Sequence, residues 1–192
     1  MKTIMISIQP QWVSKILNKE KLVEIRKTIP KCELPCKVYI YCTKGKKLYK
    51  CVSNFDEDLL NRKVVAEFTL NKVDTLERDL NDWLPKNRYD VSNELLKDIN
   101  LNQNELWNYG QGKTLYAWYI DDLKIYDKPK ELSEFSGFIP DNKCEKHENG
   151  FACEKCDAYD KEHETCLALY YAHREIKRPP QSYCYVEELE DE

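Results

Sequence analysis

The apolar residues of this chain occur mainly in short segments rich in β-branched and aromatic side chains, and this pattern most constrains the fold. Segments of this kind are typical of β-strands. We predict strands over Thr3–Ile8, Leu22–Arg26, Lys37–Cys42, Lys63–Val73, Leu115–Ile120 and Leu123–Tyr126. The aromatic residues of Leu115–Ile120 are interpreted as core rather than as a base-stacking surface.

Helical patterns are fewer and shorter. Pro10 begins a helix in which the apolar residues recur at helical spacing up to Leu17. Residues 74–112 are interpreted as a helical insertion, with Ser92 as the N-cap of one helix and a second helix over Asn104–Tyr109. Pro129 is expected to begin a loop or a short helix.

The composition changes near residue 140. Residues 140–178 hold four cysteines and all three histidines, and Pro179 and Pro180 then precede a final strand that ends at Val186. We therefore predict two parts, residues 1–139 and residues 140–192. The fold class is predicted to be α+β: a small mixed β-barrel with short helices, its edges sealed by closure, and a cysteine-rich C-terminal extension.

Bulk properties limit the class of protein. The 192 residues fit one domain with an appendage, and no apolar run approaches the roughly 20 residues that a membrane-spanning helix needs. The first residues lack the pattern of a secretion signal, and nine cysteines cannot all pair within one chain. We expect a cytoplasmic protein that does not contact membranes, with reduced thiols or a bound metal.

Charge is unevenly distributed along the sequence. Residues 1–50 contain twelve Lys and Arg against three Asp and Glu, a local charge of +9. Residues 51–192 contain eighteen against thirty-one, a local charge of −13, so the whole chain has a net charge of −4. Such asymmetry indicates a local surface for an anion or nucleic acid on an acidic body, or else lysines that serve solubility.

The segment of residues 18–27 combines two cations and a carboxylate, Lys21, Glu24 and Arg26. In a strand, Glu24 and Arg26 share one face, and Lys21 is expected on the other face unless local twist brings it round. This trio could bind an anionic ligand. It could also be an exposed ion pair worth about 0–1 kcal/mol.

The sequence resembles the ASCH domain family, which has a PUA-like fold. The resemblance rests on the segments Ser7–Pro10, Lys19–Lys27, Val38–Tyr41, Val64–Phe68, Tyr116–Ile120 and Leu123–Phe135. The segment Arg178–Val186 is similar to the tail of a phage and bacterial subgroup, with Tyr183 where Trp is more usual. One departure is Lys19, which stands where the family motif Gly-x-Lys-x-x-Glu-x-Arg has glycine.

The resemblance implies binding of RNA or a modified nucleotide in a cleft lined by Lys21, Glu24 and Arg26. We expect no nucleotide cofactor. Ser7 and Gln9 are plausible polar neighbours of this cleft. An alternative is a hydrolase, either an N4-acetylcytidine amidohydrolase or a ribonuclease, with Lys21, Glu24 and Glu67 as catalytic candidates. A third is a phage-type module that binds a protein partner. Glu24 replaces the threonine of the amidohydrolase branch, which argues against that activity.

The cysteines of the extension have partial metal-ligand spacing. Cys153 and Cys156 form a knuckle that can bind one zinc ion, with Cys144 and Cys166 as further ligands. A structural zinc, free or redox-active thiols, and disulfides are the three interpretations. Cys32 and Cys36 lie on a proline-bearing loop and are interpreted as incidental.

Overall fold

The computed structural model describes residues 3–30, 32–45, 60–80, 87–137, 159–160, 165–166, 174–176 and 178–189. Within these ranges the helices are α1 (Pro10–Leu17), α3 (Asn93–Ile99), α4 (Gln103–Gly110) and the short 3-10 helix η1 (Leu132–Glu134). The strands are β1 (Thr3–Ile8), β2 (Val23–Arg26), β3 (Cys36–Cys42), β4 (Lys63–Leu70), β5 (Val73–Leu76), β6 (Leu115–Tyr119), β7 (Asp121–Glu131), β8 (Ser136–Gly137), β9 (Tyr159–Asp160), β10 (Thr165–Cys166), β11 (Arg174–Glu175) and β12 (Tyr183–Val186).

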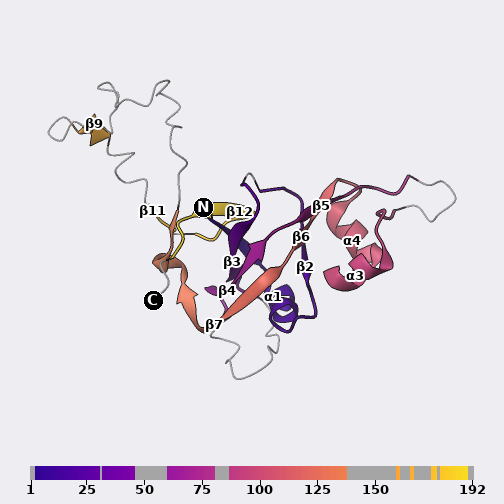
Figure 1. Cartoon of the computed structure of the whole chain (residues 1–192), viewed down its shortest axis with the longest axis horizontal. Helices are drawn as coiled ribbons and strands as arrows, with labels where there is room; N and C mark the ends of the chain where they lie inside the picture. The colour runs from indigo at the N-terminus through magenta and orange to yellow at the C-terminus, as the bar shows by residue number, and fades with distance from the viewer. Residues whose placement is uncertain are drawn as a thin grey trace.

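The described strands form two main sheets. The larger has the order β11-β8-β12-β1-β3-β4-β7, and the smaller has the order β2-β6-β5. β1 pairs parallel with β3 and antiparallel with β12, so strands from both ends of the sequence lie side by side. Figure 1 shows α3 and α4 together beside the smaller sheet, on the side away from β11 and β12.

Two bends connect these sheets. The chain leaves the larger sheet after β4, passes Asn71 and Lys72, and enters the smaller sheet as β5. It returns through Ile120, between β6 and β7. β4 pairs with β7 in one sheet, and β5 pairs with β6 in the other. The α+β class is therefore confirmed, with a single predicted strand over Lys63–Val73 divided between two sheets.

The predicted closure into a barrel is wrong for the described strands. No described ladder joins β2 to the larger sheet, because β2 pairs only with β6. A side chain links β2 to β1: the Arg26 guanidinium on β2 donates a hydrogen bond to the carbonyl oxygen of Ser7 on β1. A gap that is bridged by side chains therefore separates the edge of β2 from the end of β1.

The central strands β1 and β3 of the larger sheet are buried on both faces. Ile4, Ile6 and Val38 pack with Val13 and Ile16 of α1, whereas Met5 and Tyr39 point to the opposite face and pack with Phe135. This alternation follows from the two-residue period of a strand. Of the aromatic residues of β6, which were predicted to be core, Trp118 is fully buried, whereas Tyr116 and Tyr119 are only partly buried.

A third group of apolar residues holds α3 and α4 against the smaller sheet. Ile99 and Leu106 of the helices pack with Val23, Ile25 and Ala117 of the strands. Each helix begins at a side-chain cap, as Ser92 accepts a hydrogen bond from the Leu95 amide and Asn102 forms a capping box with Glu105. The predicted helical insertion over residues 74–112 is wrong at its start, where β5 continues to Leu76.

The loop or short helix predicted from Pro129 starts later than expected, since the 3-10 helix η1 covers Leu132–Glu134. β7 runs through Pro129 to Glu131, although proline cannot donate a hydrogen bond to a sheet. β7 tolerates it because β7 is the edge strand of the larger sheet and its register with β4 shifts between Val64 and Ala66. In the part of the chain that the structure describes, no helix is long and apolar enough to cross a membrane.

Candidate functional site

The site begins at the turn between α1 and β2. Lys19 has a φ of 59°, the left-handed conformation that glycine adopts most readily. The Lys21 amide then donates to the Lys15 carbonyl, and the Leu22 amide donates to the carbonyl of Asp98. Lys19 therefore keeps the turn that the motif glycine would favour, at the expense of some backbone strain.

Lys21 is the most buried charged residue of this turn. Its side chain is 2% exposed, and its ammonium group donates a hydrogen bond of 2.7 Å to the carbonyl oxygen of Ile99, near the C-terminus of α3. It lies 3.5 Å from the Glu24 carboxylate and 5.5 Å from the centre of the Trp12 ring. Burial lowers the pKa of Lys21, and the Glu24 carboxylate opposes this by favouring the charged form.

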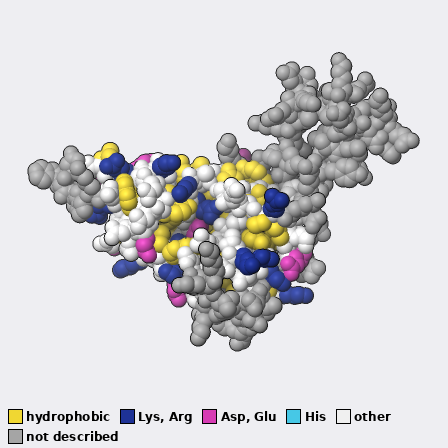
Figure 2. Space-filling view, turned by 180° about the vertical axis from the view of Figure 1, so that it is seen from behind, with side chains coloured by type: hydrophobic (Ala, Val, Ile, Leu, Met, Phe, Trp, Pro, Cys, Tyr) yellow, Lys and Arg dark blue, Asp and Glu magenta, His cyan; other side chains and the backbone are white. Residues whose placement is uncertain are grey.

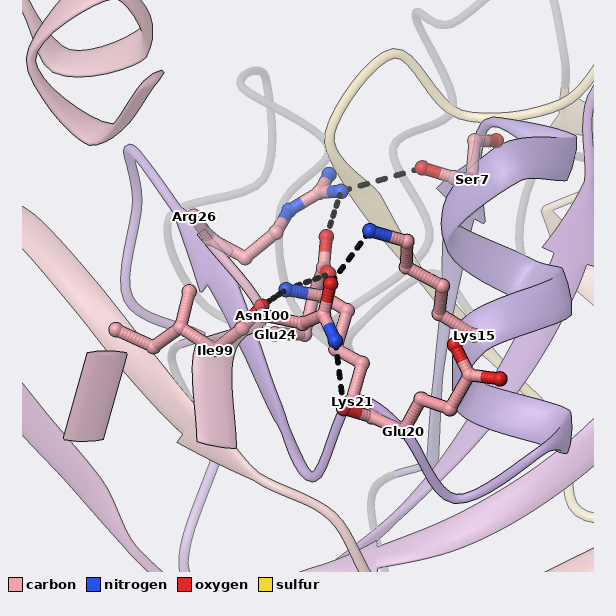
Figure 3. A network of polar contacts seen from close by, with 8 residues as sticks. All are labelled: Ser7, Lys15, Glu20, Lys21, Glu24, Arg26, Ile99 and Asn100. Atoms are coloured by element: carbon pink, nitrogen blue, oxygen red, sulfur yellow. Dashed lines mark hydrogen bonds and ion pairs between the residues drawn. The ribbon is translucent and has the colours of Figure 1, made fainter. Parts of the chain in front are cut away.

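Glu24 lies between two cations (Figure 3). Its other carboxylate oxygen is 3.7 Å from the Arg26 guanidinium, as expected for two residues on the same face of β2. The expectation that Lys21 lies on the opposite face is wrong, because β2 begins at Val23 and Lys21 belongs to the turn before it. Strand alternation therefore does not apply to Lys21.

Arg26 connects distant parts of the sequence. Its guanidinium donates to the backbone carbonyl oxygens of Ser7, at 3.2 Å, and Ser182, at 2.5 Å. Arg26 is thus held in place by β1 and by the segment that precedes β12. These carbonyls already engage some of the N–H donors of Arg26. Fewer donors therefore remain for a bidentate contact with a phosphate than an unengaged arginine would offer.

A second set of polar contacts connects the turn between α1 and β2 to both neighbouring helices. The Lys15 ammonium donates to the Asn100 side-chain oxygen, and the Asn100 amide nitrogen donates to the Glu20 carbonyl oxygen (Figure 3). Asn100 has a φ of 57° and forms the C-cap of α3. These contacts join α1, the turn and α3, so the position of Lys21 depends on all three.

The charged trio lines a cavity of about 450 Å³ at the gap between β1 and β2. All five predicted ligand-binding residues contribute to its lining: Ser7, Gln9, Lys21, Glu24 and Arg26. The other lining residues are Ile8, Trp12, Ile25, Leu101, Glu105, Asn108 and Tyr109. The Ser7 hydroxyl oxygen is buried, and it has no hydrogen-bond partner among the described residues. Buried polar groups of this kind indicate room for a polar ligand or water.

Sequence reasoning missed the contributions of α1 and α4 to this cavity. Trp12 follows the helical spacing of the core residues, and Tyr109 ends a predicted short helix, so neither stands out in the sequence. In the structure, Trp12 and Tyr109 add two aromatic rings to the lining, and Glu105 adds a second carboxylate. The capping box at Asn102 and Glu105 is the sequence signal that would have placed the start of α4.

Glu67, the remaining catalytic candidate, lies elsewhere. It accepts a hydrogen bond from the Tyr126 hydroxyl on β7 and is 3.8 Å from Lys37 and 3.7 Å from Lys124. None of these residues lines the cavity. The structure therefore does not bring Glu67 together with Lys21 and Glu24.

The predicted zinc ligands are not placed. Cys144, Cys153 and Cys156 lie outside the described residues, and Cys166 is described only as part of β10. Among the residues that the structure describes, no group of three or more His, Cys, Asp or Glu side chains could hold a metal ion. The zinc site of the extension stays a prediction.

The chemistry of the cavity combines recognition groups of three kinds. Lys21 and Arg26 carry positive charge, Glu24 accepts hydrogen bonds, and Trp12 and Tyr109 present aromatic surface. Figure 2 shows one face of the molecule, on which Lys and Arg side chains lie around apolar ones. Such a set of groups suits a planar, polar ligand that carries or adjoins negative charge.

Comparison with known proteins agrees with this fold. The crystal structure of ASCH from Zymomonas mobilis is similar to this chain, with a TM-score of 0.53 and 16% sequence identity over 97% of this chain and 88% of that one. A mutant form of the same protein gives a TM-score of 0.51 at 16% identity, over 97% of this chain and 91% of that one. No protein-family model and no curated protein matches the sequence.

The chain therefore has the fold of the ASCH domain. This confirms the fold that the sequence resemblance implies, with the difference that the described strands do not close into a barrel. The relation of Arg178–Val186 to a phage and bacterial subgroup stays a prediction.

Proposed function

We propose that this protein binds RNA and that the cavity between β1 and β2 receives one nucleotide, ordinary or modified. One observation carries the proposal: Lys21, Glu24 and Arg26, each at most 8% exposed, converge in a cavity that also contains Trp12 and Tyr109. Burying three charges is costly, and an arrangement that only held the fold together could use apolar residues at lower cost. Binding of a polar ligand by these three side chains would account for their burial.

The groups around the cavity match the parts of a nucleotide. Aromatic rings such as those of Trp12 and Tyr109 can stack on a base, and such stacking is worth about 1–3 kcal/mol per base. The Glu24 carboxylate can accept a hydrogen bond from a base amino group. Lys21 supplies a charge for a phosphate, and the local +9 charge of residues 1–50 attracts the rest of an RNA strand.

The test is equilibrium binding of a short single-stranded RNA to the wild type, Lys21→Ala and Lys19→Ala. Lys19 is exposed, lies in the same turn and does not line the cavity, so it is a matched control. We expect Lys21→Ala to weaken binding about tenfold or more, or about 1.4 kcal/mol. Lys19→Ala should have a much smaller effect.

Salt dependence separates phosphate contacts from base contacts. If Lys21 contacts a phosphate, the slope of log affinity against log salt falls in magnitude by about 0.7 in Lys21→Ala, the value for one phosphate contact on a single strand. Absence of RNA binding by the wild type, or equal losses in the two lysine variants, would contradict the proposal. Circular dichroism of each variant confirms that the fold is kept.

A second candidate function is hydrolysis of an acylated nucleoside such as N4-acetylcytidine. It is favoured by the lowered pKa of Lys21, which makes the neutral amine more accessible as a base or nucleophile. Glu24, 3.5 Å away, is placed to exchange a proton with it. Release of acetate that is lost in Lys21→Ala and retained in Lys19→Ala would support an enzyme, and binding without turnover would leave a binding protein.

A further inference from the structure

The loop between β2 and β3 contains a pair of thiols in close contact. Cys32 lies on this loop, and Cys36 is the first residue of β3. Their sulfur atoms are 2.8 Å apart, and both residues are free cysteines. A disulfide bond is about 2.05 Å long, so the two sulfurs need to approach by less than ~1 Å to form one.

We propose that Cys32 and Cys36 are a reversible dithiol–disulfide pair, which a small-molecule disulfide such as oxidised glutathione converts to an intramolecular disulfide. The Cys32 thiolate attacks one sulfur of oxidised glutathione, which forms a mixed disulfide and releases one glutathione thiolate. The Cys36 thiolate then attacks the Cys32 sulfur and releases the second. The protein loses two electrons and two protons, and one glutathione disulfide becomes two glutathione thiols.

The surroundings of the two sulfurs assign the order of these steps. Cys32 is partly exposed, so a small disulfide can reach it, whereas Cys36 is only 1% exposed and belongs to the core of the larger sheet. Burial also raises the pKa of the Cys36 thiol, which makes it a poor first nucleophile. Cys36 is therefore the resolving cysteine, and its closeness to Cys32 favours ring closure over a lasting mixed disulfide.

The pair does not belong to the cavity, since neither cysteine lines it. The loop that carries Cys32 also contacts the segment around Ser182, which holds Arg26 in place. The Thr28 hydroxyl is 2.8 Å from the Ser182 hydroxyl, and the Tyr183 hydroxyl donates to the Ile29 carbonyl. Arg26 donates to the carbonyl of the same Ser182. A disulfide across residues 32–36 would therefore restrain a loop that borders the support of Arg26.

The sequence offers a direct readout. Trypsin cleaves after Lys31 and Lys37, so both cysteines fall in one peptide, residues 32–37. The full-length protein is equilibrated in a series of buffers that differ in the ratio of oxidised to reduced glutathione. Free thiols are then alkylated, the protein is digested with trypsin, and the mass of the peptide is measured by mass spectrometry. An internal disulfide leaves it unalkylated and two hydrogen atoms lighter than the dithiol. The same series on protein unfolded in urea gives the reference.

We expect the folded protein to form the internal disulfide at least about tenfold more readily than the unfolded chain, because folding already holds the sulfurs together. Cys42→Ser, which removes another buried cysteine, should leave this equilibrium unchanged. Cys32→Ser should leave Cys36 unmodified by glutathione in the folded protein. A peptide that stays fully alkylated, carries only a mixed disulfide at Cys32, or oxidises no more readily than in urea would overturn the proposal.

Discussion

At the scale of single residues, Lys21 links stability to pH. Burial lowers its pKa below the ordinary value of 10.5, so between the lowered value and 10.5 the unfolded chain binds more protons at Lys21 than the folded chain. Stability from this site therefore rises with pH through that window. Each pKa unit of lowering corresponds to about 1.4 kcal/mol.

We therefore expect the free energy of unfolding of the wild type, relative to Lys21→Met, to increase as pH rises from the lowered pKa of Lys21 toward 10.5. Methionine keeps the length of the side chain without the charge, so the comparison cancels the titration of other groups. Urea unfolding of both proteins at several pH values measures the difference. A difference that stays constant or falls with pH would contradict this, because it would mean that the effect of Glu24 on the pKa of Lys21 outweighs the effect of burial.

Lys19 illustrates backbone strain at the same turn. A non-glycine residue in the left-handed region lowers the stability of the fold by about 1–2 kcal/mol relative to an unstrained residue. Glycine avoids this strain, but its greater conformational freedom in the unfolded chain offsets part of the gain. We expect Lys19→Gly to raise stability by about 0.5–1 kcal/mol in urea unfolding. Lys19→Ala removes the charge and keeps the strain, so it should change stability little. Equal gains in both variants would attribute the effect to charge.

At the scale of elements, the end of α4 is packed without spare room. A Cβ atom at Gly110 would lie 1.9 Å from the Tyr89 hydroxyl and 2.8 Å from a methyl carbon of Leu115. The Tyr89 hydroxyl donates to the Lys113 carbonyl, which fixes the turn into β6. The position of Tyr109 in the cavity depends on this packing.

We expect Gly110→Ala to lower stability by about 1–3 kcal/mol, as overpacking of a core does. In Gly110→Ala combined with Tyr89→Phe, the closest contact of the new methyl group, with the hydroxyl, is absent, and the contact of 2.7 Å with the ring carbon Cζ is kept. The combined loss should therefore be smaller than the sum of the single losses, as measured by a double-mutant cycle in thermal or urea unfolding. Simple additivity would mean that the clash is relieved elsewhere.

Elements were more predictable from sequence than their connections. The strands of the core, the helix from Pro10 and the cap at Ser92 follow from local residue patterns and are found in place. The predicted strand Lys63–Val73 is divided between two sheets, because the two consecutive polar residues Asn71 and Lys72 interrupt its apolar pattern and form the bend between β4 and β5. Local pattern alone does not indicate that the chain changes sheets at this point. The continuation of β7 through Pro129 was not predictable, because proline is accepted there only since β7 is an edge strand. The position of a strand within its sheet is a property of the tertiary fold.

At the scale of the whole molecule, the site is assembled from segments far apart in sequence. Lys21 depends on α3, and Arg26 depends on the segment before β12. That the charged residues line one cleft was implied by the resemblance of their segment to the family motif, since their spacing alone also fits an exposed ion pair. The aromatic residues Trp12 and Tyr109 were not predictable, because each has the pattern of an ordinary helical residue and only the packing of α1 and α4 brings them to the cavity.

The central claim is that this cavity holds a nucleotide of bound RNA, and photochemical crosslinking of a thiouridine-labelled RNA tests it most directly. The crosslinked peptides, identified by mass spectrometry, report which side chains contact a base. The account predicts crosslinks at Trp12 or Tyr109 that diminish in Lys21→Ala and persist in Lys19→Ala. Crosslinks confined to residues outside the cavity, such as Tyr126, and unaffected by Lys21→Ala would contradict it.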